Sequence, residues 1–258
     1  MTSVLGGAVV AAGAGEQGGR SAAAPGFYIW RHYILRTGTQ PRRMADYLRN
    51  AAIPALNRLG HTPVGVFEAV AGVPSPTVFM LIPCASLASV ATLDASLERD
   101  GEYMRAGAAY VDASATDPAY IRQETSLLGA FPTVPRVEVP AATATKGPRL
   151  FELRTYESAS EKAHRAKVRM FDELGEVAIF RKVGLTPVFF GRTLAGPRMP
   201  SLVYMLVHEN MAGREKSWDA FRTSPNWKKL SATPGYSDAE IVSNITTVYL
   251  RPAAYSQI

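Results

Sequence analysis

Two short segments of the chain place arginine and tyrosine at alternating positions, a spacing that suits chemistry on a small ligand. FYIWRHY begins at Phe27, and LFELRTY begins at Leu150. Alternate residues of an extended strand share one face, so the polar residues of each segment are predicted to point the same way. An arginine can hold an anionic or enolate-like oxygen while a tyrosine donates a hydrogen bond to it. The candidate ligand-binding residues are therefore Arg31, Tyr33, Glu152, Arg154 and Tyr156.

One histidine adds a proton acceptor to these candidates. His208 ends a predicted strand, and the pKa of an imidazole lies near neutrality, which suits proton transfer. His208 and Tyr156 are the candidate catalytic residues. The structural alternative is that Glu152 forms a salt bridge with Arg154 or Arg31, and that His208 is exposed or capped. The sequence leaves both interpretations open.

Several other kinds of site are not predicted. Cys84 is the single cysteine, so an intramolecular disulfide and a cysteine-based metal site are excluded. The four histidines lie far apart, so neither a metal nor a cofactor is predicted. No glycine-rich phosphate loop, GxSxG elbow or paired-carboxylate motif is present. His32 alternates with Arg31 and is predicted to lie on the opposite, helix-covered face of its strand.

Composition and charge indicate a globular chain without a nucleic-acid partner. Of the 258 residues, 47% are hydrophobic and 19% are charged, which permits a sizeable core in one large or two small domains. The net charge is +6, but the basic residues are dispersed and form no stripe. The expected partner is a small molecule, together with further copies of the chain in a homodimer or higher homo-oligomer.

The two halves of the chain repeat three sequence blocks in the same order. The two segments that open on Phe27 and Leu150 form the first pair. Gly60-x-Thr-Pro-Val and Gly184-x-Thr-Pro-Val form the second, and VFMLIP and VYMLVH form the third. A nearly constant shift of about 124 residues indicates duplicated units rather than a short-repeat solenoid. The predicted organisation is a leader (1–26), a first unit (27–131), a Pro/Ala/Thr-rich linker (132–148) and a second unit (149–252).

Each half reads as β-α-β-β-α-β, the order of a ferredoxin-like unit. Helices then cover one face of each sheet, and the bare faces must be buried against each other. The predicted fold class is α+β, with two tandem ferredoxin-like units forming a pseudo-twofold dimeric α+β barrel. In this arrangement the arginines and tyrosines are expected to point into the space between the two sheets. The predicted strands are 28–35, 64–69, 77–82 and 121–128, then 150–156, 188–193, 202–208 and 241–250; the predicted helices are 41–59, 86–109, 161–183 and 213–229.

The first residues of the chain read as a targeting segment. TSVLGGAVVAAGAG follows Met1 and is too short and too glycine-rich to span a bilayer. It is typical of the apolar region of a secretory signal that lacks its basic start, which would fit a start codon assigned too late. The expected location is periplasmic or extracellular, with no stable membrane span. If the leader is not a signal, the expected location is cytoplasmic.

The second half resembles a known family. FELRTY, GLTPV, LVYMLVHE and above all SWDAFRTSPNWKKL are similar to the NIPSNAP family, and the strand blocks extend the resemblance to roughly residues 27–250. The first half lacks the tryptophans of the last motif and looks like a diverged copy. The resemblance implies a dimeric α+β-barrel fold. It does not imply a specific activity, because the biochemical role of the family is not settled.

Two functions follow from these observations. The first is an exported NIPSNAP-like protein that binds a small ligand or a partner without catalysis. The alternative is a cofactor-free α+β-barrel enzyme, of the monooxygenase or isomerase type, that acts on a small aromatic or polyketide-like substrate in the inter-sheet pocket. Whether the chain is an enzyme is left open by the sequence.

Overall fold

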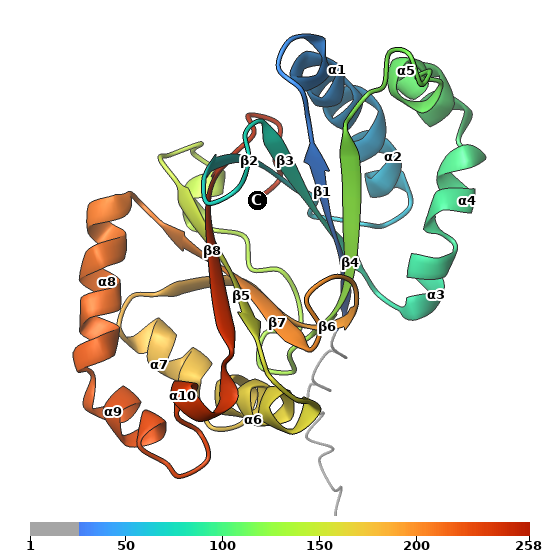
Figure 1. Cartoon of the computed structure of the whole chain (residues 1–258). Helices are drawn as coiled ribbons and strands as arrows, with labels where there is room; N and C mark the ends of the chain where they lie inside the picture. The colour runs from blue at the N-terminus through green and yellow to red at the C-terminus, as the bar shows by residue number, and fades with distance from the viewer. Residues whose placement is uncertain (1–25) are drawn as a thin grey trace, which may run out of the picture.

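The computed structural model of the chain describes residues 26–258. The predicted leader therefore lies, except for its last residue, outside the described residues. Within them the chain forms a mixed α+β structure around one closed antiparallel barrel (Figure 1). The barrel strands are β1 (Phe27–Ile34), β2 (Gly65–Ala71), β3 (Thr77–Cys84), β4 (Arg122–Ala130), β5 (Leu150–Glu157), β6 (Thr186–Ala195), β7 (Ser201–His208) and β8 (Asn244–Pro252).

The order of the strands around the barrel is β1-β3-β2-β8-β5-β7-β6-β4, and β4 pairs with β1 to close it. The first half of the chain thus contributes β4-β1-β3-β2, and the second half contributes β8-β5-β7-β6 in the same order. The halves meet along two seams, β2 with β8 and β4 with β6. Both seams contain a register shift, at Ala69/Ala71 and at Leu127/Leu128. Barrel closure leaves no free sheet edge.

Short helices connect the strands on the outside of the barrel. Figure 1 shows the helices of the first half on one side and those of the second half on the opposite side. The helices are α1 (Thr39–Tyr47), a π-helical turn (Leu48–Ala52), α2 (Ile53–Arg58), α3 (Leu87–Ala91), α4 (Leu93–Glu98), α5 (Gly101–Val111), a 3-10 turn (Ala141–Thr143), α6 (Glu161–Asp172), α7 (Glu176–Lys182), α8 (Met211–Thr223), α9 (Pro225–Ser231) and α10 (Asp238–Ile241).

Three apolar clusters show which strand faces point where. The cluster inside the barrel contains Trp30, Phe67, Phe151 and Phe189, among others. Two further clusters lie between the barrel and the two helix groups, one on each side. An eight-stranded barrel is just wide enough for side chains to fill its interior, so the large apolar residues of alternate positions pack there.

The C-terminal tail packs against the inside of the barrel. The side chain of Ile258 is buried in the interior cluster. The carboxamide oxygen of Gln257 accepts a hydrogen bond from the amide of Val64 at 2.7 Å, and the hydroxyl of Ser256 accepts one from the amide of Val66 at 3.0 Å. These bonds satisfy amide groups where β2 begins, and they fix the tail at this end of the barrel.

Candidate functional site

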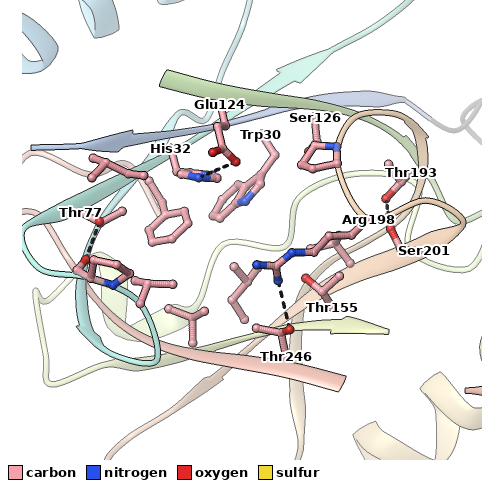
Figure 2. Close-up of a pocket in the computed structure, with 18 residues that line it drawn as sticks. Trp30, His32, Thr77, Glu124, Ser126, Thr155, Thr193, Arg198, Ser201 and Thr246 are labelled. Carbon is pink, nitrogen blue, oxygen red and sulfur yellow. Dashed lines mark hydrogen bonds and ion pairs between the residues drawn. The ribbon is translucent and has the colours of Figure 1, made fainter. Parts of the chain in front are cut away.

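A cavity of about 220 Å³ lies at one end of the barrel interior (Figure 2). It is bounded by the end of β1 and β5, the beginning of β3, β4, β7 and β8, and the loops that join β2 to β3 and β6 to β7. Its apolar lining includes Trp30, Phe79, Leu153, Val203 and Val248, all of them buried. The rings of Trp30 and Phe79 stack with centroids 5.3 Å apart. Since an apolar cavity of about 150 Å³ is known to hold benzene, this one is large enough for a small aromatic ligand.

His32 and Glu124 form a polar pair on the wall of this cavity. His32 follows Trp30 on the interior face of β1, and Glu124 lies opposite it on β4. His32 Nε2 lies 3.2 Å from Glu124 Oε2 (Figure 2). Burial lowers the pKa of His32; Glu124 opposes this effect, and the positive charge of Arg198 adds to it. The imidazole is therefore neutral at pH 7, and Glu124 orients it.

Arg198 reaches across the mouth of the cavity from the loop between β6 and β7. Its guanidinium donates a hydrogen bond to the hydroxyl of Thr246 at 3.1 Å (Figure 2). The backbone of Arg198 is left-handed, with φ of 63°, which is unusual for a residue other than glycine and costs free energy. Within residues 26–258 no carboxylate forms an ion pair with Arg198. Its charge is thus free to meet a negative group on a ligand.

The cavity combines a base, a cation and an apolar surface. A neutral imidazole held by a carboxylate can accept a proton. A guanidinium on the other side of the ligand can stabilise the negative charge that develops on an oxygen. Hydroxyl groups complete the polar lining, among them Thr155 and the hydrogen-bonded pair Thr193 and Ser201, whose oxygens are 2.8 Å apart. This arrangement is suited to proton abstraction next to a carbonyl group.

The residues predicted from the sequence lie outside this cavity. The expectation that the arginines and tyrosines of β1 and β5 point between the sheets is wrong, because Tyr33 and Tyr156 pack in the two clusters under the helices. The expectation that His32 faces a helix layer is wrong for the same reason. The narrow barrel interior is filled by bulky apolar side chains such as Trp30 and Phe151. The arginines lie instead in the layer between the sheet and the helices, because at the outer edge of this layer they can reach a charged partner.

Glu152 is the centre of a buried network on the helix side of β5. Its carboxylate accepts hydrogen bonds from Arg214 at 2.8 and 2.9 Å and from the Trp218 indole at 2.8 Å, and His208 Nε2 lies 3.2 Å away. Arg154 lies 3.6 Å from the same carboxylate. Burial alone would raise the pKa of Glu152, but the bonds from His208, Arg214 and Trp218 outweigh it and lower the pKa to about 2. The Glu152–Arg154 contact agrees with the structural alternative, but the exposed His208 expected with it is wrong, because His208 is buried against Glu152. The network as a whole joins α8 to the sheet.

Tyr156 and Arg31, the remaining predicted residues, are also on the helix side. Tyr156 is buried, and its hydroxyl accepts a hydrogen bond from Tyr204 at 3.3 Å. Burial raises the pKa of Tyr156. Arg31 Nη2 donates to Asp94 Oδ1 on α4 at 3.1 Å. The structure thus brings Glu152, Arg154 and His208 together, but it separates all the predicted residues from the barrel cavity. Their role in ligand binding stays a prediction.

The described residues contain neither a metal-binding cluster nor a helix that could cross a membrane. Across residues 26–258 no group of three or more His, Cys, Asp or Glu side chains is placed to hold a metal ion. In the same range no helix has the length and apolar character that crossing a bilayer requires.

The second half of the chain is similar to a known family. Residues 151–257 match the NIPSNAP family model. The resemblance noted in the sequence is thus confirmed for the second half. The matched segment supplies β5 to β8 and, with them, Arg198 and Thr246 of the cavity. His32 and Glu124 come from the preceding half, so the cavity is built by both. A comparison with curated proteins gave no match.

Solved structures share the fold at low sequence identity. A presumed monooxygenase from Lactobacillus acidophilus has 10% identity and a TM-score of 0.59, and the match covers 88% of this chain and 94% of that one. A presumed monooxygenase from Fusobacterium nucleatum has 7% identity and a TM-score of 0.54, with 89% and 93% covered. An anthrone oxidase-like protein has 10% identity and a TM-score of 0.50, with 90% and 93% covered. Similarity of this degree supports the barrel fold and nothing more specific.

The cavity residues differ from the site residues predicted from the sequence. His32 stands in the same segment as Arg31, but on the strand face opposite to the one predicted to bind a ligand. Glu124 and Arg198 are single charged residues in a strand and a loop, without a motif around them. The large residues Tyr28 and Trp30 share the strand face of His32, but the opposite face is buried as well, so this pattern does not distinguish the barrel interior from the helix-covered side.

Proposed function

We propose that the barrel cavity is an acid–base site for a small aromatic ketone or phenol, and that the protein is a cofactor-free enzyme of the monooxygenase or isomerase type. The observation that carries this proposal is the placement of His32, held by Glu124, opposite the unpaired Arg198 across an apolar cavity. The name of one structural neighbour, an anthrone oxidase-like protein, supports the same substrate class, and the names of two others, presumed monooxygenases, support the reaction type.

In the proposed step, a C–H bond breaks at a carbon whose electron pair can be conjugated with the substrate carbonyl. This carbon is either next to the carbonyl or, in anthrone, the methylene carbon on the opposite side of the ring. If Nε2–H of His32 donates to Glu124, the second ring nitrogen, Nδ1, is the proton acceptor. The electron pair of the broken bond moves onto the carbonyl oxygen, and the resulting enolate lies beside Arg198. Glu124 stabilises the imidazolium that forms. Return of the proton to another carbon completes an isomerisation, whereas reaction of the enolate with dioxygen begins an oxygenation.

The second candidate function is binding without turnover. The same cavity would then hold an anionic aromatic molecule, with its negative group on Arg198 and its ring against Trp30 and Phe79. This function needs the cation and the apolar lining but no proton transfer. It is favoured if the cavity binds such ligands and His32 is dispensable.

One broader proposal concerns the origin of the barrel, and two expectations from the sequence stay predictions. We propose that the barrel consists of two ferredoxin-like units that arose by duplication, which the shared strand order of the two halves supports. The barrel closes within one chain, so a homodimer is not needed to complete it, and self-association stays a prediction. Export stays a prediction that rests on residues outside the described part of the chain.

Proton transfer can be tested with anthrone as the probe. The full chain is incubated with anthrone in deuterated buffer without dioxygen, and loss of the methylene proton signal is followed by NMR. We expect exchange faster than in buffer alone, a loss of about 10²-fold or more in His32→Gln, and a smaller loss in Glu124→Gln. His164→Gln, on α6 outside the cavity, is the matched control and should exchange like the unmodified protein.

The possible results separate the two functions. Equal exchange in His32→Gln and the unmodified protein would contradict the acid–base role of His32. Binding of anthrone without any acceleration of exchange would favour the binding function. Loss of exchange in His164→Gln as well would show that the variants act through stability.

A further inference from the structure

A second cavity lies outside the barrel, between the sheet and the helices of the first half. It has a volume of about 310 Å³ and is lined by residues of β1, β4, α1, α4 and α5. Figure 1 shows α4 and α5 beside β1 and β4. Arg31 of β1 is at its inner side, and four tyrosines form much of the wall: Tyr47, Tyr103, Tyr110 and Tyr120. This cavity has no part in the proposed function.

The corresponding place in the second half is filled by the protein itself. Arg154 occupies on β5 the position that Arg31 occupies on β1, because both strands are central in the same order. The ring of Trp218 from α8 covers the Arg154 guanidinium at 4.6 Å, and the buried carboxylate of Glu152 lies 3.6 Å from it. An aromatic ring and a buried carboxylate of the protein thus lie against this arginine, although its Nε has no hydrogen-bond partner among the described residues.

The first half has no counterpart of Glu152 or Trp218, and the carboxylate that contacts its arginine belongs to an exposed residue. The strand position of Glu152 is taken by Ile29, and the helix residue that contacts the arginine is the small Asp94 instead of Trp218. The side chain of Arg31 is 14% exposed, whereas that of Asp94 is 77% exposed. Ion pairs with such an exposed partner contribute little free energy, so another carboxylate can replace Asp94 at low cost.

The tyrosines give the cavity an aromatic wall with hydroxyl groups at its edge. The rings of Tyr47 and Tyr110 stack with centroids 3.6 Å apart. The hydroxyls of Tyr47 and Tyr103 are 3.0 Å apart, and that of Tyr110 donates to Gln123 at 3.3 Å. A flat ring fits against such a wall, because aromatic pairs favour offset or tilted contact.

We propose that the Arg31 cavity is a second ligand site, which takes a small aromatic carboxylate. The carboxylate of the ligand replaces Asp94 on the Arg31 guanidinium, and its ring lies against the tyrosine wall. The ligand supplies the two groups that Glu152 and Trp218 supply in the second half. The site is separate from the barrel cavity and does not depend on its chemistry.

The test is calorimetric titration of the full chain with benzoate. We expect binding that weakens at least about tenfold in Arg31→Met, because a charge-assisted bond is lost, and that strengthens severalfold in Asp94→Asn, because a competing carboxylate is removed. Cyclohexanecarboxylate and inorganic phosphate should bind more weakly than benzoate. Arg43→Met is the matched control, since Arg43 is a similarly buried arginine paired with an exposed aspartate, Asp117.

Variants of the barrel cavity distinguish this site from the proposed active site. Benzoate binding that persists in His32→Gln and Arg198→Gln supports the Arg31 site, whatever the outcome of the exchange experiment. Binding that disappears in Arg198→Gln and is unchanged in Arg31→Met would overturn the proposal and leave the proposed function intact. Absence of benzoate binding to the unmodified protein would also overturn the proposal. So would benzoate binding that is no stronger in Asp94→Asn, because this variant changes only an exposed residue and should fold normally.

Discussion

At the mouth of the barrel cavity, the charge on His32 depends on two neighbours of opposite sign. Burial and Arg198 lower the pKa of His32, and Glu124 raises it. Arg198→Gln should therefore raise the pKa of His32, and Glu124→Gln should lower it further. NMR titration of the histidine ring protons measures both shifts, with the signals of His61, His164 and His208 as internal controls. An unchanged His32 titration in Arg198→Gln would show that the guanidinium does not face the imidazole.

This lowered pKa also sets a direction for stability. The unfolded chain binds a proton at His32 below about pH 6.5, the ordinary histidine value, whereas the folded chain does so only at lower pH. The contribution of His32 to the free energy of unfolding is therefore present above about pH 6.5 and is lost as the pH falls through the lowered pKa of the folded chain. The proposed proton transfer needs the neutral form of His32. Its rate should therefore rise with pH as His32 loses its proton, and it should level off before neutrality.

On the other side of β5, Glu152 should be important for stability rather than for proton transfer. Glu152→Gln leaves Arg154, Arg214 and His208 without their shared carboxylate, and the expected loss in the free energy of unfolding is about 3 kcal/mol. The pKa of Glu152 is lowered to about 2, so its contribution is present above about pH 4.5 and is lost as the pH falls toward 2. Chemical denaturation between pH 7 and pH 2.5 measures this, and an equally steep acid dependence in Glu152→Gln would contradict it.

The residues of β1 show why the cavity was not found from the sequence. One face of this strand holds Ile29, Arg31 and Tyr33, and the other holds Trp30 and His32. Both faces are buried, one by helices and one by the barrel, so polarity does not alternate in a way that tells inside from outside. Pairing across the barrel brings Glu124 to His32, and that contact depends on the β1–β4 register rather than on local sequence.

At the scale of elements, the strands and the outer limits of the helical stretches were predicted closely, but three of the four predicted helices are broken into shorter ones. The stretch predicted as one helix over 86–109 forms α3, α4 and α5. The break before α5 had a local signal, because Asp100 caps that helix and accepts bonds from the amides of Glu102 and Tyr103. Gly60 and Gly184 lie just after α2 and α7 and have positive φ, a conformation in which a residue without a Cβ ends a helix at no steric cost.

The C-terminal tail is an element that hydrophobic pattern did not predict, and its contribution can be measured. Ile258 is fully buried in the barrel interior, so Ile258→Ala should lower the free energy of unfolding by roughly 2–4 kcal/mol, as expected for a large-to-small change in a core. Ile245→Ala on β8 is the control, because Ile245 is 37% exposed and should cost less. Equal losses in the two variants would mean that the tail does not pack in the interior.

At the scale of the whole molecule, two halves with the same strand order close one barrel. The repeated blocks of sequence indicated this order, but they did not indicate which side chains fill the interior. Closure requires the β2–β8 and β4–β6 seams, and these join His32 and Glu124 of one half to Arg198 and Thr246 of the other. The cavity is therefore a property of the closed chain, and neither half contains its base and its cation together.

The most direct test of a ligand site inside the barrel uses the three tryptophans, Trp30, Trp218 and Trp227, which lie in different layers. An unreactive aromatic ketone is titrated into ¹⁵N-labelled protein while the three indole N–H signals are followed. Trp30 lines the barrel cavity, whereas Trp218 and Trp227 pack under the helices of the second half. We predict that the Trp30 signal shifts in a saturable way and that the other two stay in place. Shifts confined to Trp218 or Trp227, or none at saturating ligand, would contradict the account.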